Sequence, residues 1–184
     1  TDAGGSIEIA NNEALGTGAI LINGNDLRLN NVTIDEPITV HAYAGGGAIT
    51  GLGASNVLSG TVTLNESCDV RGNNITWSGG VTGAAGKGIG LNGSRHVFHT
   101  NPIEIGSGNL GFTSAGNNPA NASELNVAGN DFGQLTINFG AYLTLGVSNA
   151  WPADVDLKFG WHLNSSSSGT LNLNGFDQSV ESIH

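Results

Sequence analysis

The sequence predicts an all-β protein folded as an elongated parallel β-solenoid. Three observations predict it: a glycine-rich composition with little charge, short segments of alternating apolar and polar residues, and recurring turn dipeptides. The chain has 184 residues, of which 30 are glycine, 38% are hydrophobic and 11% are charged. Glycine and asparagine disfavour helices, whereas the hydrophobic fraction is large enough for a long, thin core. Length and even composition predict a single domain over residues 1–184.

Alternating segments predict half-buried strands along the whole chain. In each segment apolar side chains occupy every second position, which places them on one face of an extended backbone. The predicted strands cover residues 6–9, 19–22, 27–29, 38–40, 60–64, 75–77, 89–91, 103–105, 125–127, 135–139, 143–145, 155–159 and 171–173.

The pieces between these strands are short, and many contain Asn-Gly or Gly-Asn. Such dipeptides tolerate positive φ, so they close hairpins and solenoid corners equally well. An apolar residue followed by Asn-Gly recurs after a predicted strand at residues 22–24, 91–93 and 173–175. Repetition of strand and corner without helices favours a coil stacked on itself.

Two stretches, residues 12–64 and residues 169–183, carry a family resemblance. Residues 13–18 read Glu-Ala-Leu-Gly-Thr-Gly, residues 20–24 Ile-Leu-Ile-Asn-Gly, residues 27–31 Leu-Arg-Leu-Asn-Asn and residues 58–64 Leu-Ser-Gly-Thr-Val-Thr-Leu. Residues 169–183 read Gly-Thr-Leu-Asn-Leu-Asn-Gly-Phe-Asp-Gln-Ser-Val-Glu-Ser-Ile, whereas residues 84–165 keep only the alternation. These motifs resemble the autotransporter-associated β-strand repeat of giant bacterial surface proteins. The resemblance implies a single-stranded right-handed parallel β-helix, exported and displayed at the bacterial cell surface, and it implies no catalytic residue.

Charge and cysteine content exclude several classes of function. The net charge is −10 with only 5 lysines and arginines, which argues against nucleic acid or anionic lipid as a partner. The single cysteine, Cys68, excludes an internal disulfide framework and a thiolate cluster, and we expect it to be a small, half-buried strand residue. No apolar run is long enough to span a bilayer, and no signal peptide opens the chain. Because the first residues already approach a strand, we expect a fragment of a larger repeat protein.

Carboxylates are the first candidates for chemistry, because polysaccharide-cleaving β-helices place paired acids or acid-bound Ca²⁺ on a solvent-facing sheet. The candidate pairs are Asp35 with Glu36, Glu66 with Asp69, and Asp154 with Asp156. Alternating acids are also the usual polar face of an exposed strand, and we favour that interpretation. We therefore expect no enzyme activity, no cofactor and no metal site.

The histidines do not form a metal site in the predicted strands. In an extended segment at residues 94–100, His96 and Phe98 face one way, while Val97 and His99 face the other, so the two histidines do not meet as ligands. His41 and His162 stand alone in the sequence and are expected to be surface or cap residues.

Aromatic residues provide a weak binding hypothesis. Trp77, Trp151 and Trp161 would form a stacking platform for sugar rings if they projected from one side. For any single one of them we favour the alternative that it fills the core or seals an end of the solenoid.

The function predicted from these observations is a non-catalytic structural or adhesive module of a large secreted or surface-displayed bacterial protein. The alternative is a polysaccharide-binding module, and a polysaccharide-degrading enzyme is the less favoured third reading. Expected partners are a host or environmental surface, a polysaccharide, or neighbouring repeats of the same protein, with no nucleic acid and no membrane insertion.

Overall fold

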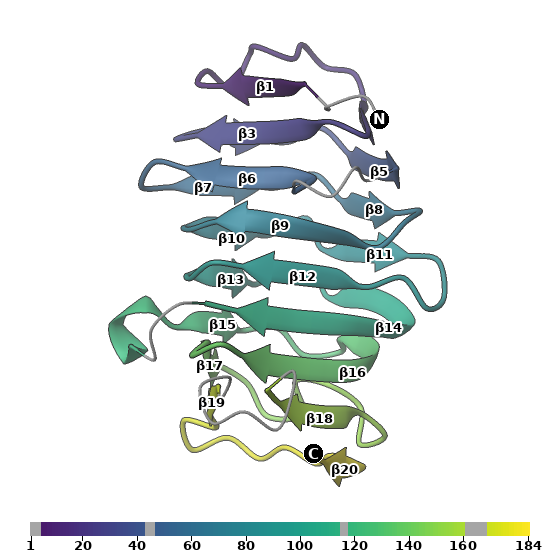
Figure 1. Cartoon of the computed structure of the whole chain (residues 1–184), viewed down its shortest axis with the longest axis vertical. Coiled ribbons are helices and arrows are strands. Elements are labelled where there is room, and N and C mark those ends of the chain that lie inside the picture. The colour runs from purple at the N-terminus through teal and green to yellow at the C-terminus, as the bar shows by residue number, and fades with distance from the viewer. Residues whose placement is uncertain (1–4, 43–46, 115–117, 161–168) are drawn as a thin grey trace.

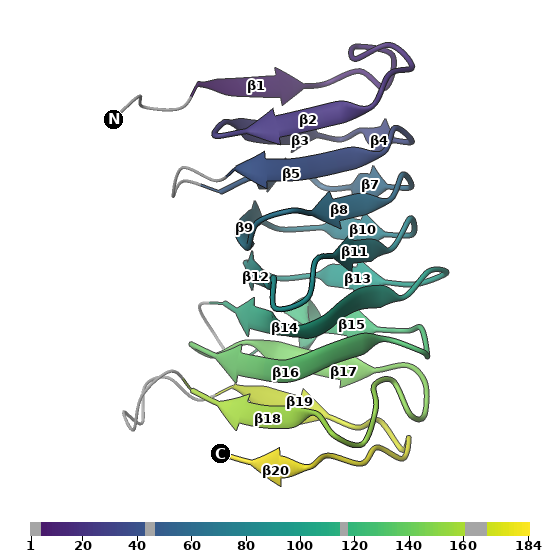
Figure 2. The ribbon, with the colours of Figure 1, turned by 90° about the vertical axis from the view of Figure 1, so that its right-hand side faces the viewer.

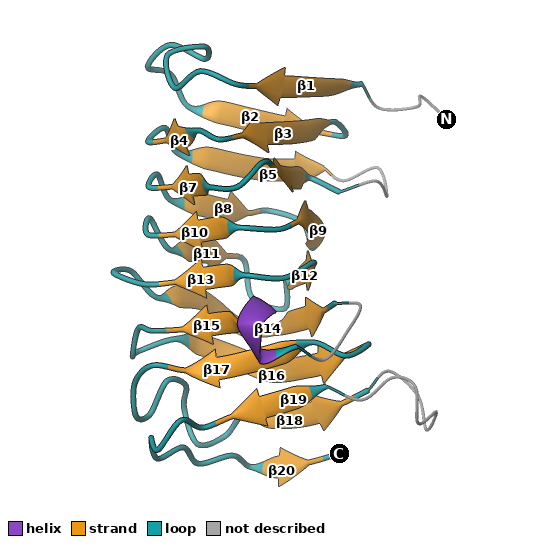
Figure 3. Ribbon diagram, turned by 90° about the vertical axis from the view of Figure 1, so that its left-hand side faces the viewer, coloured by secondary structure: helices purple, strands orange, loops and turns teal. Residues whose placement is uncertain are grey.

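The computed structural model is a parallel β-solenoid of about seven turns, as the sequence predicts, and it is right-handed, as the family resemblance implies. It describes residues 5–42, 47–114, 118–160 and 169–184. Strands on the side facing the viewer in Figure 1 run leftward as the chain descends from its N-terminal end. In Figure 2 the strands of one flanking side run toward the side that faces the viewer in Figure 1, and in Figure 3 the strands of the other flanking side run away from it. This path makes the coil right-handed.

Each regular turn lays one strand on each of three faces, which we number in chain order. Face 1 holds β2 (Ile20–Asn23), β5 (Ile38–Ala42), β8 (Val62–Leu64), β11 (Val81–Gly83) and the first part of β14 (Ile103–Thr113). Face 2 holds β1 (Ser6–Ile9), β3 (Asp26–Asn30), β6 (Ile49–Leu52), β9 (Cys68–Gly72), β12 (Ile89–Asn92), the second part of β14, β16 (Asp131–Asn138), β18 (Asp156–Phe159) and β20 (Ser182–Ile183). Face 3 holds β4 (Thr33–Ile34), β7 (Asn56–Leu58), β10 (Ile75–Trp77), β13 (His96–Phe98), β15 (Ser123–Leu125), β17 (Tyr142–Leu145) and β19 (Thr170–Asn172). A 3-10 turn, η1 (Pro119–Asn121), precedes β15.

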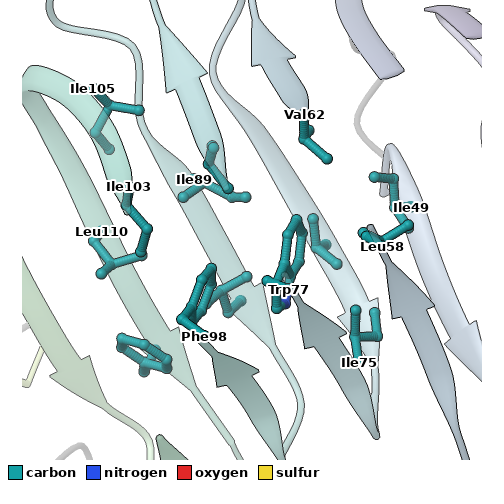
Figure 4. Close-up of a cluster of buried hydrophobic side chains, with 14 of the residues drawn as sticks. Ile49, Leu58, Val62, Ile75, Trp77, Ile89, Phe98, Ile103, Ile105 and Leu110 are labelled. Atoms are coloured by element: carbon teal, nitrogen blue, oxygen red, sulfur yellow. The ribbon is translucent and has the colours of Figure 1, made fainter. Parts of the chain in front are cut away.

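The parallel register stacks like residues on like, so the core consists of apolar columns. On face 3 the inward column runs through Ile34, Leu58, Trp77, Phe98, Leu125 and Leu145. The rings of Trp77 and Phe98 stack with centroids 5.2 Å apart, and Figure 4 shows them among aliphatic side chains from the neighbouring strands. Since the strands between the terminal ones pair with the turns before and after them, their backbone polar groups are satisfied while their inward side chains fill the interior.

Buried asparagines hold corners where the backbone leaves a sheet. Asn130 is 1% exposed, and its Oδ1 accepts from the Ile103 N–H at 2.8 Å. Its Nδ2 donates to the carbonyls of Val127 and Ala150, both at 2.7 Å. A single polar side chain thereby satisfies backbone groups of three turns, which fixes how those turns stack.

Candidate functional site

The tryptophans do not form the surface platform considered from the sequence. Trp77 is fully buried in the face 3 column, and Trp151 is 3% exposed with its ring 6.1 Å from that of Phe132. Both therefore fill the core, and neither ring can stack on a sugar in solution. The hypothesis of a sugar-stacking platform is therefore wrong for Trp77 and Trp151. The favoured alternative, that a single tryptophan fills the core, is what the structure shows for both. Trp161 lies outside the described residues.

Two of the carboxylates weighed as members of catalytic pairs, Glu66 and Asp156, have separate local partners. Glu66 accepts from Lys87 Nζ at 2.8 Å, and this ion pair lowers the pKa of Glu66. Asp156 accepts from the Ser182 hydroxyl and lies 4.0 Å from His184 Nε2. Within the described ranges no cluster of three or more His, Cys, Asp or Glu side chains could hold a metal ion.

The histidine segment alternates as predicted. His96 and Phe98 are fully buried, whereas Val97 and His99 lie on the outer side. Burial lowers the pKa of His96 to about 4. A smaller effect from the Gly72 backbone raises the pKa and so opposes that shift. The contact between the His96 ring and Gly72 does not have the geometry of a hydrogen bond, and neither ring nitrogen has a hydrogen-bond partner in the described part of the chain. His96 is therefore a neutral core residue at neutral pH. His162 falls outside the described ranges.

Cys68 lies in a strand, β9, as expected, but at 5% exposure it is buried and not half-buried. Burial, with a smaller contribution from Asp69, raises the pKa of the thiol to about 12. At physiological pH the sulfur is thus a protonated, apolar part of the core.

A groove crosses the outer surface of face 2 at β9, β12, β14 and β16, on the side that faces the viewer in Figure 1. Its floor exists because two consecutive turns place glycine at the same outward position. The register aligns Asp69, Gly90, Gly111 and Thr136 in one outward column, in which Asp69 and Gly90 are half-buried and Gly111 and Thr136 are buried. The hollow has a volume of about 430 Å³, and a second hollow of about 610 Å³ adjoins it along Asn92, Thr113 and Phe139.

Amide donors and a carboxylate acceptor converge over this glycine floor. A β-carbon at Gly111 would lie 3.5 Å from Asn109 Nδ2, and one at Gly90 would lie 3.9 Å from Asn92 Nδ2. A β-carbon at Gly90 would also overlap the Asp69 carboxylate, so that group lies directly over the floor. The Asp69 carboxylate therefore fills the space that the missing side chain of Gly90 leaves, and the Asn109 amide borders the corresponding space at Gly111.

Neighbouring hydroxyls orient the groove's amides. Asn109 Oδ1 accepts from the Thr136 hydroxyl at 3.0 Å, which turns its Nδ2 toward the floor. Asn138 Oδ1 accepts from the Thr113 hydroxyl at 2.6 Å in the adjacent column. Side chains held by such bonds lose little conformational freedom when a ligand arrives.

Phe139 is the aromatic residue at the rim shared by the two hollows. Its side chain is 49% exposed, and its φ is +50°. With Gly140 at φ +78° and a hydrogen bond from the Ala141 N–H to the Asn138 carbonyl at 2.9 Å, it forms a type I′ turn. The residues of this groove were not identified from the sequence as a site, apart from Asp69, which was weighed there as a partner of Glu66.

Comparisons with protein-family models, with curated proteins and with solved structures gave no match. The resemblance to the autotransporter-associated β-strand repeat therefore rests on the sequence motifs alone. Within the described ranges, no helix has the length and apolar character required to cross a membrane.

Proposed function

We propose that the chain is a non-catalytic structural and adhesive module of a larger secreted or surface-displayed bacterial protein. The observation that carries the proposal is the unbroken pairing of face 2, in which β1, β3, β6, β9, β12, β14, β16, β18 and β20 pair in succession. Bending such a stack would separate paired strands and open the core that they share. The solenoid therefore acts as a stiff segment that holds a contact surface at a fixed position.

The charge of the chain limits which partners the adhesive part of this proposal allows. A net charge of −10 keeps an exported rod soluble and repels anionic partners. Its partners would be a host or environmental surface, a polysaccharide, or adjacent repeats of the same protein. Polysaccharide binding is the second candidate function, and the groove on face 2 favours it.

The arrangement of acids supports a non-catalytic role. Glycoside hydrolysis by the usual mechanism needs two carboxyl groups facing each other across the scissile bond. Glu66 is engaged by Lys87 and Asp156 by Ser182, while Asp69 is the carboxylate that lines the groove.

The stiffness can be tested by spin labelling at both ends of face 2. Glu8→Cys and Glu181→Cys, combined with Cys68→Ala, place labels on exposed positions in or beside β1 and β20. Eight strand-to-strand steps of ~4.8 Å, combined with an offset of about five residues along the strands at ~3.3 Å each, predict a separation of about 41 Å. A narrow distance distribution near that value is expected from electron double resonance, and a broad one would refute the rod.

Adhesion and catalysis are tested with the unlabelled chain. Beads coated with it should adhere to bacterial or host-cell surfaces more strongly than beads coated with an unrelated acidic protein. The same chain, incubated with a panel of polysaccharides, should release no reducing ends. Release of oligosaccharide products would overturn the non-catalytic assignment, and failure of the beads to adhere would remove the adhesive one.

A further inference from the structure

We propose that Asn174 is a site of spontaneous covalent modification, at which attack by the Gly175 backbone nitrogen converts the asparagine into aspartate and isoaspartate. The two other Asn-Gly dipeptides of the chain, at residues 23–24 and 92–93, have the same sequence, but sheet hydrogen bonds hold the nitrogen that would attack. The fold thus places three identical dipeptides in different surroundings and leaves one of them reactive. The modification is independent of adhesion and of stiffness, so it goes beyond the proposed function.

The reaction needs a free backbone N–H directly after an asparagine. The Gly175 nitrogen gives its proton to hydroxide in the solvent and bonds to Asn174 Cγ, while the side-chain nitrogen takes up a proton and leaves as ammonia. Water then opens the resulting five-membered imide at one of its two carbonyls. Opening at the side-chain carbonyl gives aspartate, and opening at the main-chain carbonyl gives isoaspartate, in which the backbone runs through the side chain. Glycine favours the attack because it has no side chain to crowd the nitrogen.

The first two dipeptides lack this free N–H. The Gly24 N–H donates to the Ala42 carbonyl at 3.0 Å, and the Gly93 N–H donates to the Thr113 carbonyl at 2.8 Å. The Gly93 backbone also packs so tightly that a β-carbon there would overlap the Gly72 carbonyl, and it directly follows β12, which is paired on both sides. Either nitrogen can attack only after the sheet opens locally, and that opening costs free energy.

Asn174 and Gly175 are both exposed, in a turn that follows β19. Their φ values are +52° and +82°, and the Phe176 N–H donates to the Leu173 carbonyl at 2.9 Å, as in a type I′ turn. The Gly175 N–H donates to no acceptor in the described part of the chain. Apart from its two chain neighbours, no described atom lies within 4 Å of the position that a β-carbon at Gly175 would take. The attacking nitrogen is therefore open to solvent.

The Asn174 side chain is held by one long hydrogen bond. Its Nδ2 donates to the Leu145 carbonyl at 3.3 Å, and its Oδ1 accepts no hydrogen bond from the described residues. The preceding strand, β19, pairs with β17 alone among the described strands. A turn held by so few bonds opens at low free-energy cost, so the rotation that brings Asn174 Cγ to the Gly175 nitrogen is accessible.

The products loosen the turn between β19 and β20. The nitrogen that bonds to the Leu145 carbonyl leaves as ammonia, and the carboxylate that replaces the amide has no proton to donate to that carbonyl. Isoaspartate also lengthens the backbone of a two-residue turn by one methylene. Each conversion adds one negative charge to a chain whose net charge is −10.

Peptide mapping of the folded full chain, aged in mildly alkaline buffer, tests the site. Digestion in acid followed by chromatography and mass spectrometry separates the asparagine, aspartate and isoaspartate forms of each peptide. We expect Asn174 to react at least about tenfold faster than Asn23 and Asn92, and to give both products. In urea the three sites should react at similar rates, because an aliphatic residue precedes each Asn-Gly dipeptide.

Four outcomes would overturn the proposal. Equal rates in the folded chain, or a faster reaction at Asn23 or Asn92, would show that the N–H bonds do not protect. An undiminished lead of Asn174 in urea would assign its rate to sequence and not to structure. Aspartate without isoaspartate would indicate direct hydrolysis of the amide instead of attack by Gly175.

Two variants separate the attack from its consequence. Gly175→Asn keeps a residue that tolerates positive φ but crowds the nitrogen, so the reaction at Asn174 should slow at least about tenfold, and an unchanged rate would overturn the attack. Asn174→Asp reproduces one product, and hydrogen exchange at the Phe176 amide should accelerate at least about threefold. Asn23→Asp is the matched control, because it makes the same charge change elsewhere and should leave that exchange rate unchanged. Equal exchange in both variants would refute the loosening of the turn.

Discussion

Acidification should destabilise the protein through His96, a residue that lies inside the solenoid between Ile75 and Ser123 in the face 3 register. The ordinary pKa of 6.5 falls to about 4 in the folded chain because burial disfavours the charged ring. Between pH 6.5 and about 4, His96 therefore binds a proton in the unfolded chain but not in the folded chain. The stability contributed by the neutral ring is complete above pH 6.5 and is lost progressively as the pH falls toward 4.

The size of the effect follows from the pKa difference. With about 1.36 kcal/mol for each pKa unit, the difference between 6.5 and about 4 corresponds to about 3 kcal/mol of unfolding free energy. His96→Leu removes the titration and places an aliphatic residue in a column that already holds Ile75. At neutral pH this variant should be at least as stable as the wild type, because it also removes two buried ring nitrogens without hydrogen-bond partners among the described residues.

Urea unfolding at pH 7.5 and pH 4.5 measures the prediction. The wild type should lose about 2 to 3 kcal/mol more than His96→Leu between these two conditions. His99→Gln is the matched control, since it removes a neighbouring histidine from the outer side and should keep the wild-type pH dependence. Equal losses in the wild type and His96→Leu would refute the reasoning.

Three further predictions follow from single buried groups. Trp77→Ala should lower the unfolding free energy by about 3 to 5 kcal/mol in urea titrations, because it leaves a cavity beneath the stacked ring of Phe98. Asn130→Ala should cost about 2 to 4 kcal/mol in the same assay, since it strands one backbone N–H and two carbonyls, and a loss below 1 kcal/mol would contradict it. Cys68 should resist iodoacetamide at pH 8 in the folded chain and react once urea unfolds it, as mass spectrometry would show.

Strand positions could be predicted from the sequence wherever inward residues are large and apolar. Every predicted segment overlaps an observed strand, but β4, β6, β7, β9, β11 and β20 were missed. Of these, β4, β11 and β20 are only two or three residues long, and the others have a small or polar residue at an inward position: Gly51 in β6, Asn56 in β7 and Cys68 in β9. Asn56 is tolerated inside because its amide donates to the Leu52 carbonyl at 2.6 Å, a tertiary compensation that alternation does not reveal.

The stacking register could not be predicted, because the turns differ in length. Ile20 pairs with Ile38, which pairs with Val62, which pairs with Val81, so consecutive turns on face 1 are unequal. The repeated Asn-Gly phrase does not mark one corner either. Its copy at residues 22–24 follows a face 1 strand, the copy at 91–93 ends a face 2 strand, and the copy at 173–175 follows a face 3 strand. Recurrence thus identifies corners without indicating which corner each one is.

The groove was missed because its residues come from separate turns and because alternation misplaces Phe139. Leu135 and Ile137 point inward, so the same period of two puts Phe139 in the core as the end of a strand over residues 135–139. The strand instead ends at Asn138, and positive φ at Phe139 and Gly140 turns the backbone and carries the ring outward. The sequence signal was the Asn-Phe-Gly run, in which glycine after a bulky residue marks a tight turn. A strand prediction that stops at such a run places the aromatic residue at the surface, where a ligand can reach it.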